Sequence, residues 1–285
     1  MRFHFHLRQL VDIAPWHNAD GSNPHLGWFG LTDGWYWIEA GSAELFRYNR
    51  PLVAKWRREY SDVPWLEALP YVDYQVSRLW EDVLEILPAV LDPVPSRLAH
   101  ALGPDEPWIN WERAAKTAVE QAPHEQEAWD LLESAAGWWW ARQLNTSYLQ
   151  AAPQICFWSD GADIHIQWDN RACVLDGLPA WEAVIGEHKA PVADFIAEAQ
   201  AFDARFLSRM HDRIAIAQSE WTRPDVALEP GLNQEQVART GWPARRFDAI
   251  KGQDLTHWDA VFQAIARIEA LPGFATDHAL RLSHS

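Results

Sequence analysis

The sequence predicts an α+β fold: a twisted, mainly antiparallel sheet built from two hairpin regions and covered by several amphipathic helices. Two Asp-Gly pairs carry this prediction, because Asp-Gly between apolar runs is a strong hairpin signal. The pairs are Asp33-Gly34 and Asp160-Gly161. Between and after these pairs, apolar residues recur every three or four positions, which indicates helices that cover the sheet.

The first 60 residues are predicted to be mainly sheet. Residues 3–7 alternate apolar and polar side chains, as a half-buried strand does. The apolar segments 26–31 and 35–38 flank Thr32-Asp33-Gly34 and are expected to form a hairpin. Residues 45–48 extend the same sheet.

A set of helices is predicted for the middle of the chain, where apolar residues follow helical spacing. They are expected over residues 71–91, from Pro95 onward, over 111–121 with Asn110 as N-cap, and over 125–144. The last of these contains three consecutive tryptophans, Trp138, Trp139 and Trp140. Because three successive side chains cover most of a helix circumference, at least one should meet a partner or another layer of the same chain, and the three are candidate binding residues.

A second β unit follows. Segments 154–158 and 163–168 surround Asp160-Gly161, and a two-residue turn there places Phe157 opposite Ile164. The same register sets Cys156 opposite His165 on the other face. Further strands are expected at 174–175 and within 181–188.

The remaining chain is predicted to be helical. A long helix begins at Pro191 and runs to about residue 218, and shorter helices are expected over 234–239 and 255–270. We expect one α+β domain over residues 1–218 and a helical C-terminal extension over 219–285 that packs on it. A split near residue 150 is the alternative, because the order β, α, β, α also describes two units.

Charge argues against nucleic acid and membrane partners. The chain has 285 residues, with 24 Lys and Arg against 40 Asp and Glu, and a net charge of −16. Such a surplus repels phosphate backbones and anionic lipids. The most basic segment is interpreted as a solvated, salt-bridged stretch; it contains Arg47, Arg50, Lys55, Arg57 and Arg58.

Other features concern compartment and cofactors. Two cysteines cannot build a disulfide framework, and no signal peptide or apolar run of about 18 residues is present, so a cytoplasmic location is expected. No GxGxxG, P-loop or GxSxG motif occurs. No cofactor is therefore predicted.

Two pairs of residues are candidates for chemistry. Cys156 and His165 form the catalytic candidate, since an imidazole opposite a thiol can activate it. Free cysteine is more often an inert buried residue. His4 and His6 have a spacing that can ligate zinc, but no third ligand is close in sequence. They are interpreted as the polar face of a strand, and no metal is predicted.

A binding surface is the other hypothesis. Asp33 from the first hairpin, and Asp169 with Asn170 from the second, are expected at the rim of one sheet, with Trp35 and Trp37 nearby. Exposed aromatic rings beside carboxylates suit an interface with a basic partner. The structural alternative for Asp169 and Asn170 is a turn, in which their side chains form hydrogen bonds with the backbone.

Two segments resemble one family. Residues 29–38, FGLTDGWYWI, and residues 166–171, IQWDNR, resemble the hallmarks of a family of uncharacterised bacterial proteins, a domain of unknown function. The resemblance covers most of residues 1–218. It implies a bacterial, intracellular protein and transfers no activity, cofactor or catalytic residue.

The sequence favours a non-enzymatic interaction protein. The concrete expectation is an immunity or antitoxin-type inhibitor that occupies a basic surface of a protein partner through acidic complementarity and aromatic anchors. The alternative is an enzyme or small-ligand binder with a Trp-lined cleft that contains carboxylates. The oligomeric state stays open.

Overall fold

The computed structural model describes residues 1–60, 70–102, 107–122, 124–249 and 256–280. It confirms a mixed α+β fold with antiparallel sheets. The strands form two main sheets rather than one. The first contains β1 (Arg2–Leu7), β3 (Asp33–Ala40), β4 (Ala43–Leu45) and β5 (Val72–Gln75), and the second contains β6 (Ile155–Ser159), β7 (Asp163–Asp169) and β10 (Ile185–Pro191).

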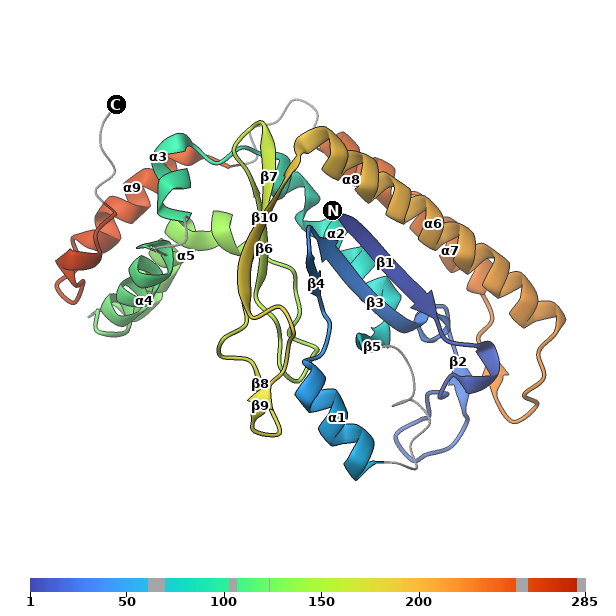
Figure 1. The fold of residues 1–285 in the computed structure, drawn as a ribbon. Helices are drawn as coiled ribbons and strands as arrows, with labels where there is room; N and C mark the ends of the chain where they lie inside the picture. Colours follow the sequence, from blue (N-terminus) through green and yellow to red (C-terminus); the bar gives the residue numbers. More distant parts are fainter. Residues whose placement is uncertain (61–69, 103–106, 123, 250–255, 281–285) are drawn as a thin grey trace.

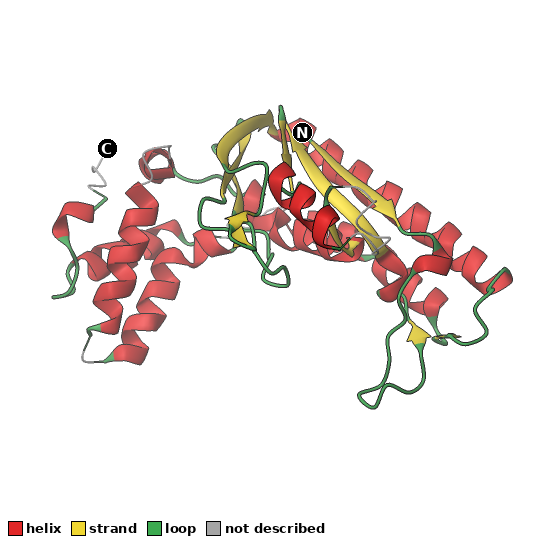
Figure 2. Cartoon of the chain, turned by 60° about the horizontal axis from the view of Figure 1, so that its bottom comes forward, coloured by secondary structure: helices red, strands yellow, loops and turns green. Residues whose placement is uncertain are grey.

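Two short pairs complete the β structure: β2 (His25–Leu26) with β11 (Ala227–Leu228), and β8 (Val174–Leu175) with β9 (Leu178–Pro179). The helices are α1 (Arg50–Glu59), α2 (Val76–Leu91), α3 (Ser96–Ala99), α4 (Pro107–Glu120), α5 (Glu125–Trp140), α6 (Val192–Ser219), α7 (Leu232–Thr240), α8 (Trp242–Ala249) and α9 (Trp258–Glu269). Figure 2 shows them around both sheets. Within the described ranges, no helix combines the length and apolarity needed to cross a membrane.

The first predicted hairpin is wrong. Residues 30–32 form a short 3₁₀ helix, and Asp33 begins strand β3 instead of a turn. Gly34 is required by close approach, since a Cβ there would lie 2.2 Å from the carbonyl oxygen of His6 on β1. The turn into the next strand lies at Gly41, whose φ is +63° and favours glycine. A sequence pattern does not distinguish these two uses of glycine.

The second hairpin is confirmed, but its register differs from the prediction by two residues. Ser159 pairs with Ile164, so residues 160–163 form the connection. Its width has a local cause, because the Asp160 carboxylate accepts hydrogen bonds from the N–H groups of Ala162 and Asp163, both at 2.9 Å. A shift by two residues keeps every side chain on its expected face.

The predicted helices are present with shifted ends. The segment 71–91 begins with strand β5 before α2, and α5 ends at Trp140 instead of residue 144. Helix α6 begins at Val192, one residue after the predicted start, and Pro191 is its N-cap. Helices α1 and α8 were not predicted, and Asn110 lies inside α4 instead of capping it. Residue 255, the expected start of the last helix, lies outside the described residues.

Two hydrophobic clusters form the core, and β6 contributes to both. Its Ile155 and Phe157 join a cluster that contains the first sheet, α2 and α6. Its Cys156 and Trp158 join a second cluster with α4, α5 and α9. The second sheet therefore stands between the two groups of helices (Figure 1). Helix α7 packs on α6 and α9 packs on α5; the boundaries at 218 and 150 stay predictions.

Candidate functional site

The outer face of the first sheet contains three of the predicted binding residues, Asp33, Trp35 and Trp37. Strand alternation turns Phe3 and Ile38 inward, where both are buried. The opposite face carries aromatic and charged side chains from β1, β3, β4 and β5. Together with Arg8 and Tyr71, which directly adjoin β1 and β5, these side chains form what we call the aromatic sheet face: His4, His6, Arg8, Asp33, Trp35, Trp37, Glu39, Glu44, Tyr71 and Asp73.

A row of stacked rings crosses this face. The Trp37 ring lies between His4 and Tyr71, with centroid distances of 4.8 and 4.1 Å and interplanar angles of 6° and 9°. A carboxylate stands at each end of the row. His4 Nε2 is 3.0 Å from a Glu39 oxygen, and the Tyr71 hydroxyl donates to Glu44 at 2.8 Å. Partial burial and this bond to Glu44 raise the pKa of Tyr71 to about 12, so the hydroxyl remains a donor at neutral pH.

A second row is centred on Arg8. Its guanidinium donates to Asp33 at 2.9 Å and to Asp73 at 2.5 Å, and it lies 4.4 Å from the Trp35 ring centroid. Burial raises the pKa of Asp73, although the Arg8 hydrogen bond opposes that effect. Arg8 is therefore paired with two carboxylates at once, and the row contains one more acidic than basic group.

The predicted residues from the second hairpin lie elsewhere. Asp33, Trp35 and Trp37 share β3, whereas Asp169 ends β7 in the other sheet. Asp169 is held by Arg171 at 2.9 and 2.6 Å, and this ion pair lowers the pKa of the carboxyl.

Asn170 has a structural role at this turn. It is buried, its amide nitrogen donates to Ala183 O at 2.8 Å, and its side-chain oxygen accepts from Gln154 N at 3.0 Å. The expected single rim of Asp33, Asp169 and Asn170 is therefore not formed.

Most of the predicted tryptophan anchors are covered. Trp35, Trp138 and Trp139 are 7%, 5% and 8% exposed, and the last two lie in the second core cluster. Trp140 is half-buried and donates to a Glu112 carboxylate oxygen at 3.0 Å. The layer that meets the Trp138 to Trp140 run thus comes from the chain itself, through α4 and α9. On the aromatic sheet face, Trp37 is the half-exposed indole.

Cys156 and His165 do not form the predicted pair. Cys156 is opposite Gln167, and His165 is opposite Trp158. Burial raises the pKa of the Cys156 thiol well above its usual range, so it is not a nucleophile at neutral pH. His165 instead stacks on Trp158 at 3.7 Å.

His165 also contacts carboxylates through both ring nitrogens. Nε2 is 3.0 Å from Asp160, and Nδ1 is 3.2 Å from Glu187. Each contact joins a ring nitrogen to a carboxylate oxygen, which can only accept, so His165 links Asp160 in the hairpin connection to Glu187 on β10. This arrangement holds the hairpin and β10 together.

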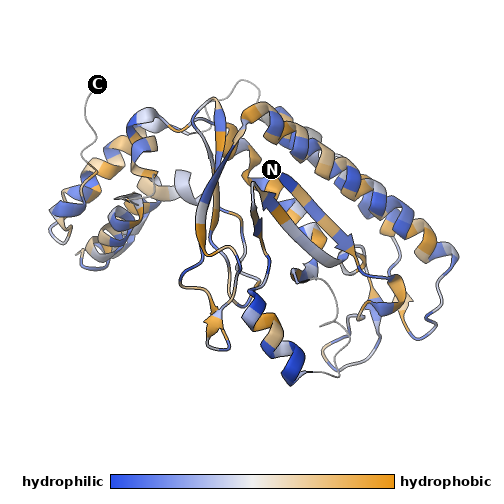
Figure 3. Cartoon of the chain, in the orientation of Figure 1, coloured by the Kyte–Doolittle hydropathy of each residue, from blue (hydrophilic) through white to orange (hydrophobic). Residues whose placement is uncertain are grey.

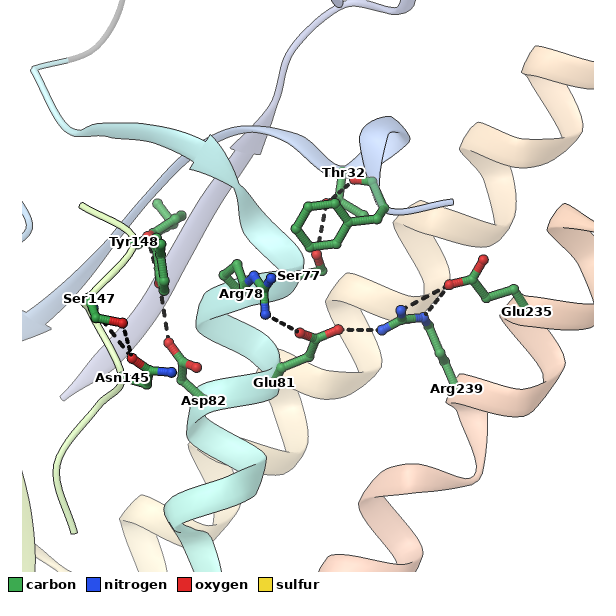
Figure 4. A network of polar contacts seen from close by, with 12 residues as sticks. Thr32, Ser77, Arg78, Glu81, Asp82, Asn145, Ser147, Tyr148, Glu235 and Arg239 are labelled. Atoms are coloured by element: carbon green, nitrogen blue, oxygen red, sulfur yellow. Dashed lines mark hydrogen bonds and ion pairs between the residues drawn. The ribbon is translucent and has the colours of Figure 1, made fainter. Parts of the chain in front are cut away.

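The sequence did not predict a buried carboxylate that lies on α2. Asp82 is 6% exposed and accepts a hydrogen bond of 3.2 Å from the Tyr148 hydroxyl (Figure 4). The Tyr148 hydroxyl is also 3.0 Å from that of Tyr36. Burial raises the pKa of Asp82 to about 7, with Glu81 and Glu85 acting in the same direction. Residues 36, 82 and 148 are far apart in sequence, so no local pattern marks this group.

Two surface cavities accompany these sites. One, of about 790 Å³, is lined by α1 and includes four arginines and Lys55, without a lining carboxylate. The other, of about 1010 Å³, lies between β1 and α6 and has Asp212 as its lining carboxylate. Neither has a tryptophan in its lining, so neither matches the Trp-lined cleft of the enzyme hypothesis, which stays a prediction.

His4 and His6 project from the aromatic sheet face, as their spacing predicts. His4 contacts Glu39, and the His6 ring lies 5.8 Å from that of Trp35. In the part of the chain that the structure describes, no three His, Cys, Asp or Glu side chains are grouped to hold a metal ion.

The fold and this face define a mixed α+β protein with a charge-paired aromatic sheet surface. Residues 2–264 match a family of unknown function, DUF5984, and the chain belongs to that family. The match spans both segments that carried the resemblance. No curated protein matches the sequence, and no solved structure matches it.

Proposed function

We propose that this protein is a non-enzymatic interaction module that binds a basic protein partner through the aromatic sheet face. The observation that carries the proposal is the His4, Trp37, Tyr71 stack with Glu39 and Glu44 at its ends. Half-exposed rings supply contact area and cation–π acceptors, and Glu39, whose side chain is 52% exposed, supplies a partner for Lys or Arg, whereas Glu44 is already paired with Arg47.

The charge of the whole chain supports the same partner chemistry. At −16, the protein attracts a basic surface over distance and accelerates the encounter with it. We infer an immunity or antitoxin type of inhibitor, because occupying a basic surface is how an acidic protein blocks a partner that acts on an anionic substrate. The unpaired cysteines Cys156 and Cys173 support a cytoplasmic location, where thiols stay reduced.

A charge reversal at the edge of the ring row tests this function. The Glu39 side chain is 52% exposed, so Glu39→Lys should leave the fold intact while it repels a basic partner. The tagged protein is used to capture partners from its native host, and toxins encoded beside its gene are co-expressed to measure rescue. We expect Glu39→Lys to reduce both capture and rescue about tenfold, which corresponds to about 1.4 kcal/mol of binding free energy.

Glu127→Lys is the matched control, because Glu127 is exposed on α5, outside the aromatic sheet face. It changes the net charge equally and should retain binding. Equal loss in both variants would mean that total charge alone matters and would contradict the proposed site. The absence of any captured protein, together with the absence of rescue, would overturn the function itself.

A further inference from the structure

A groove runs along the free edge of β1. Strand β1 pairs with β3 on one side, and no described strand pairs with its other side. Helix α6 forms the opposite wall of the groove, whose volume is about 1010 Å³. Figure 3 shows hydrophilic and hydrophobic residues alternating along α6. Most of its apolar residues are buried, and its groove side consists of polar residues and Ile216.

The backbone of β1 offers unused hydrogen-bonding groups to this groove. Arg8 N donates to Asp33 O on β3, and strand alternation then turns the N–H and C=O groups of Phe3, Phe5 and Leu7 outward. Side chains of α6 already form hydrogen bonds with the N–H and C=O groups of Phe3. The backbone N–H and C=O groups of Phe5 and Leu7 have no hydrogen-bond partner among the described residues.

The two groups at Phe3 are held from α6. Glu198 accepts from Phe3 N at 2.9 Å, and Arg205 donates to Phe3 O at 2.9 Å. At the other end of the strand, Arg213 donates to Arg8 O. The edge is thus closed at both ends and open across Phe5 and Leu7.

A row of arginines follows the opening. Arg205, Arg209 and Arg213 recur every four residues on one face of α6 and line the groove with Arg2. Arg209 is exposed and, among the described residues, has no ion-pair partner. Four residues of helix rise about 6 Å, which is close to the roughly 6.8 Å between alternate residues of an extended strand.

We propose that this groove binds an extended segment of another protein, with carboxylates at alternate positions, as an added strand beside β1. Its backbone pairs with the free groups of Phe5 and Leu7, and its carboxylates face Arg209 and its neighbours. A second copy of this chain fits poorly, because pairing β1 with β1 would bring two arginine rows together. The site uses the backbone edge of β1 and the arginines of α6, shares His4 and His6 with the aromatic sheet face, and does not depend on the function proposed above.

A defined peptide tests the site without knowledge of the natural ligand. The probe is a fluorescent seven-residue peptide with glutamate at every second position and valine between, and its binding is followed by anisotropy. We expect binding that weakens as salt increases. Lysine in place of glutamate should abolish binding, and N-methylation of the edge-facing amides should weaken it at least tenfold, because main-chain pairing is lost.

Arg209→Glu should weaken the probe at least tenfold, whereas Arg245→Glu, an equal charge change at an exposed position on α8, should not. Equal effects of both variants, or a probe insensitive to N-methylation, would overturn strand addition. Sedimentation of the protein alone tests whether a second copy of this chain occupies the groove. A dimer that becomes more stable in Arg209→Glu, where the repulsion is relieved, would assign the edge to a second copy and overturn the proposal.

Discussion

Replacing Asp82 with asparagine should stabilise this protein at neutral and alkaline pH. Asparagine keeps the shape of the side chain and an oxygen that accepts from Tyr148, but it carries no charge. Asp82 is 6% exposed, and burial raises its pKa to about 7 from an ordinary 3.8. Above pH 7 the folded protein therefore contains a buried carboxylate that the variant lacks.

The difference between the pKa of Asp82 in the folded and unfolded states sets the sign and the size of the stability change with pH. Between about pH 4 and pH 7 the unfolded chain has lost the Asp82 proton while the folded protein keeps it, so raising the pH favours unfolding. The stabilising contribution of the protonated group is complete below pH 4 and is lost as pH rises through 7. At roughly 1.4 kcal/mol per pKa unit, the total is about 4 kcal/mol. Asp82→Asn should remove this dependence.

Urea denaturation of both proteins from pH 4 to pH 8.5 measures the effect. The variant's gain in free energy of unfolding should grow across pH 4 to 7 and stay constant above it. Glu127→Gln, an exposed carboxylate on α5, is the control and should give a pH-independent difference near zero. A gain for Asp82→Asn that is the same at every pH, or that shrinks as pH rises, would refute the argument from burial.

Three further outcomes are expected. Arg142→Met should lower the free energy of unfolding by about 3 kcal/mol in urea, because the fully buried guanidinium donates to Trp138 O and Asp92 O; an unchanged midpoint would contradict this. Cys156 should resist iodoacetamide in the native protein at pH 8 and react in denaturant, as mass spectrometry will show, since burial raises its pKa. Gly34→Ala should cost about 2 kcal/mol, because its Cβ meets His6 O, and equal melting temperatures would rule out that close approach.

Sequence patterns correctly predicted those elements whose structure depends on residues close together in the chain. Helix α6 was expected from Pro191 onward because its apolar spacing covers 28 residues, and the structure begins it at Val192. The second hairpin was expected from Asp160-Gly161, and its faces were correct. The register was not, because the Asp160 side chain widens the turn through hydrogen bonds that the pair of residues alone does not reveal.

The missed features depend on contacts between distant segments. The Asp82, Tyr148 and Tyr36 group joins three separate elements. Glycine is required at position 34 because the backbone of β1 lies against it, and not because of its neighbours in sequence. Three consecutive tryptophans predicted contact with either a partner or another layer of the same chain, and the structure covers Trp138 and Trp139 with α4 and α9. Sequence periodicity predicts which side of one helix is buried, but it does not show whether another helix packs on the opposite side.

Strand β1 connects the two proposed binding sites and also allows them to be separated. Its side chains His4 and His6 belong to the aromatic sheet face, while its outward backbone groups line the groove beside α6. A change that shifts the register of β1 would alter both, because a one-residue slip exchanges the faces of every side chain. Glu39→Lys and Arg209→Glu leave that register untouched. If the first abolishes capture of a basic partner and only the second weakens the acidic peptide, the two surfaces act independently on one strand.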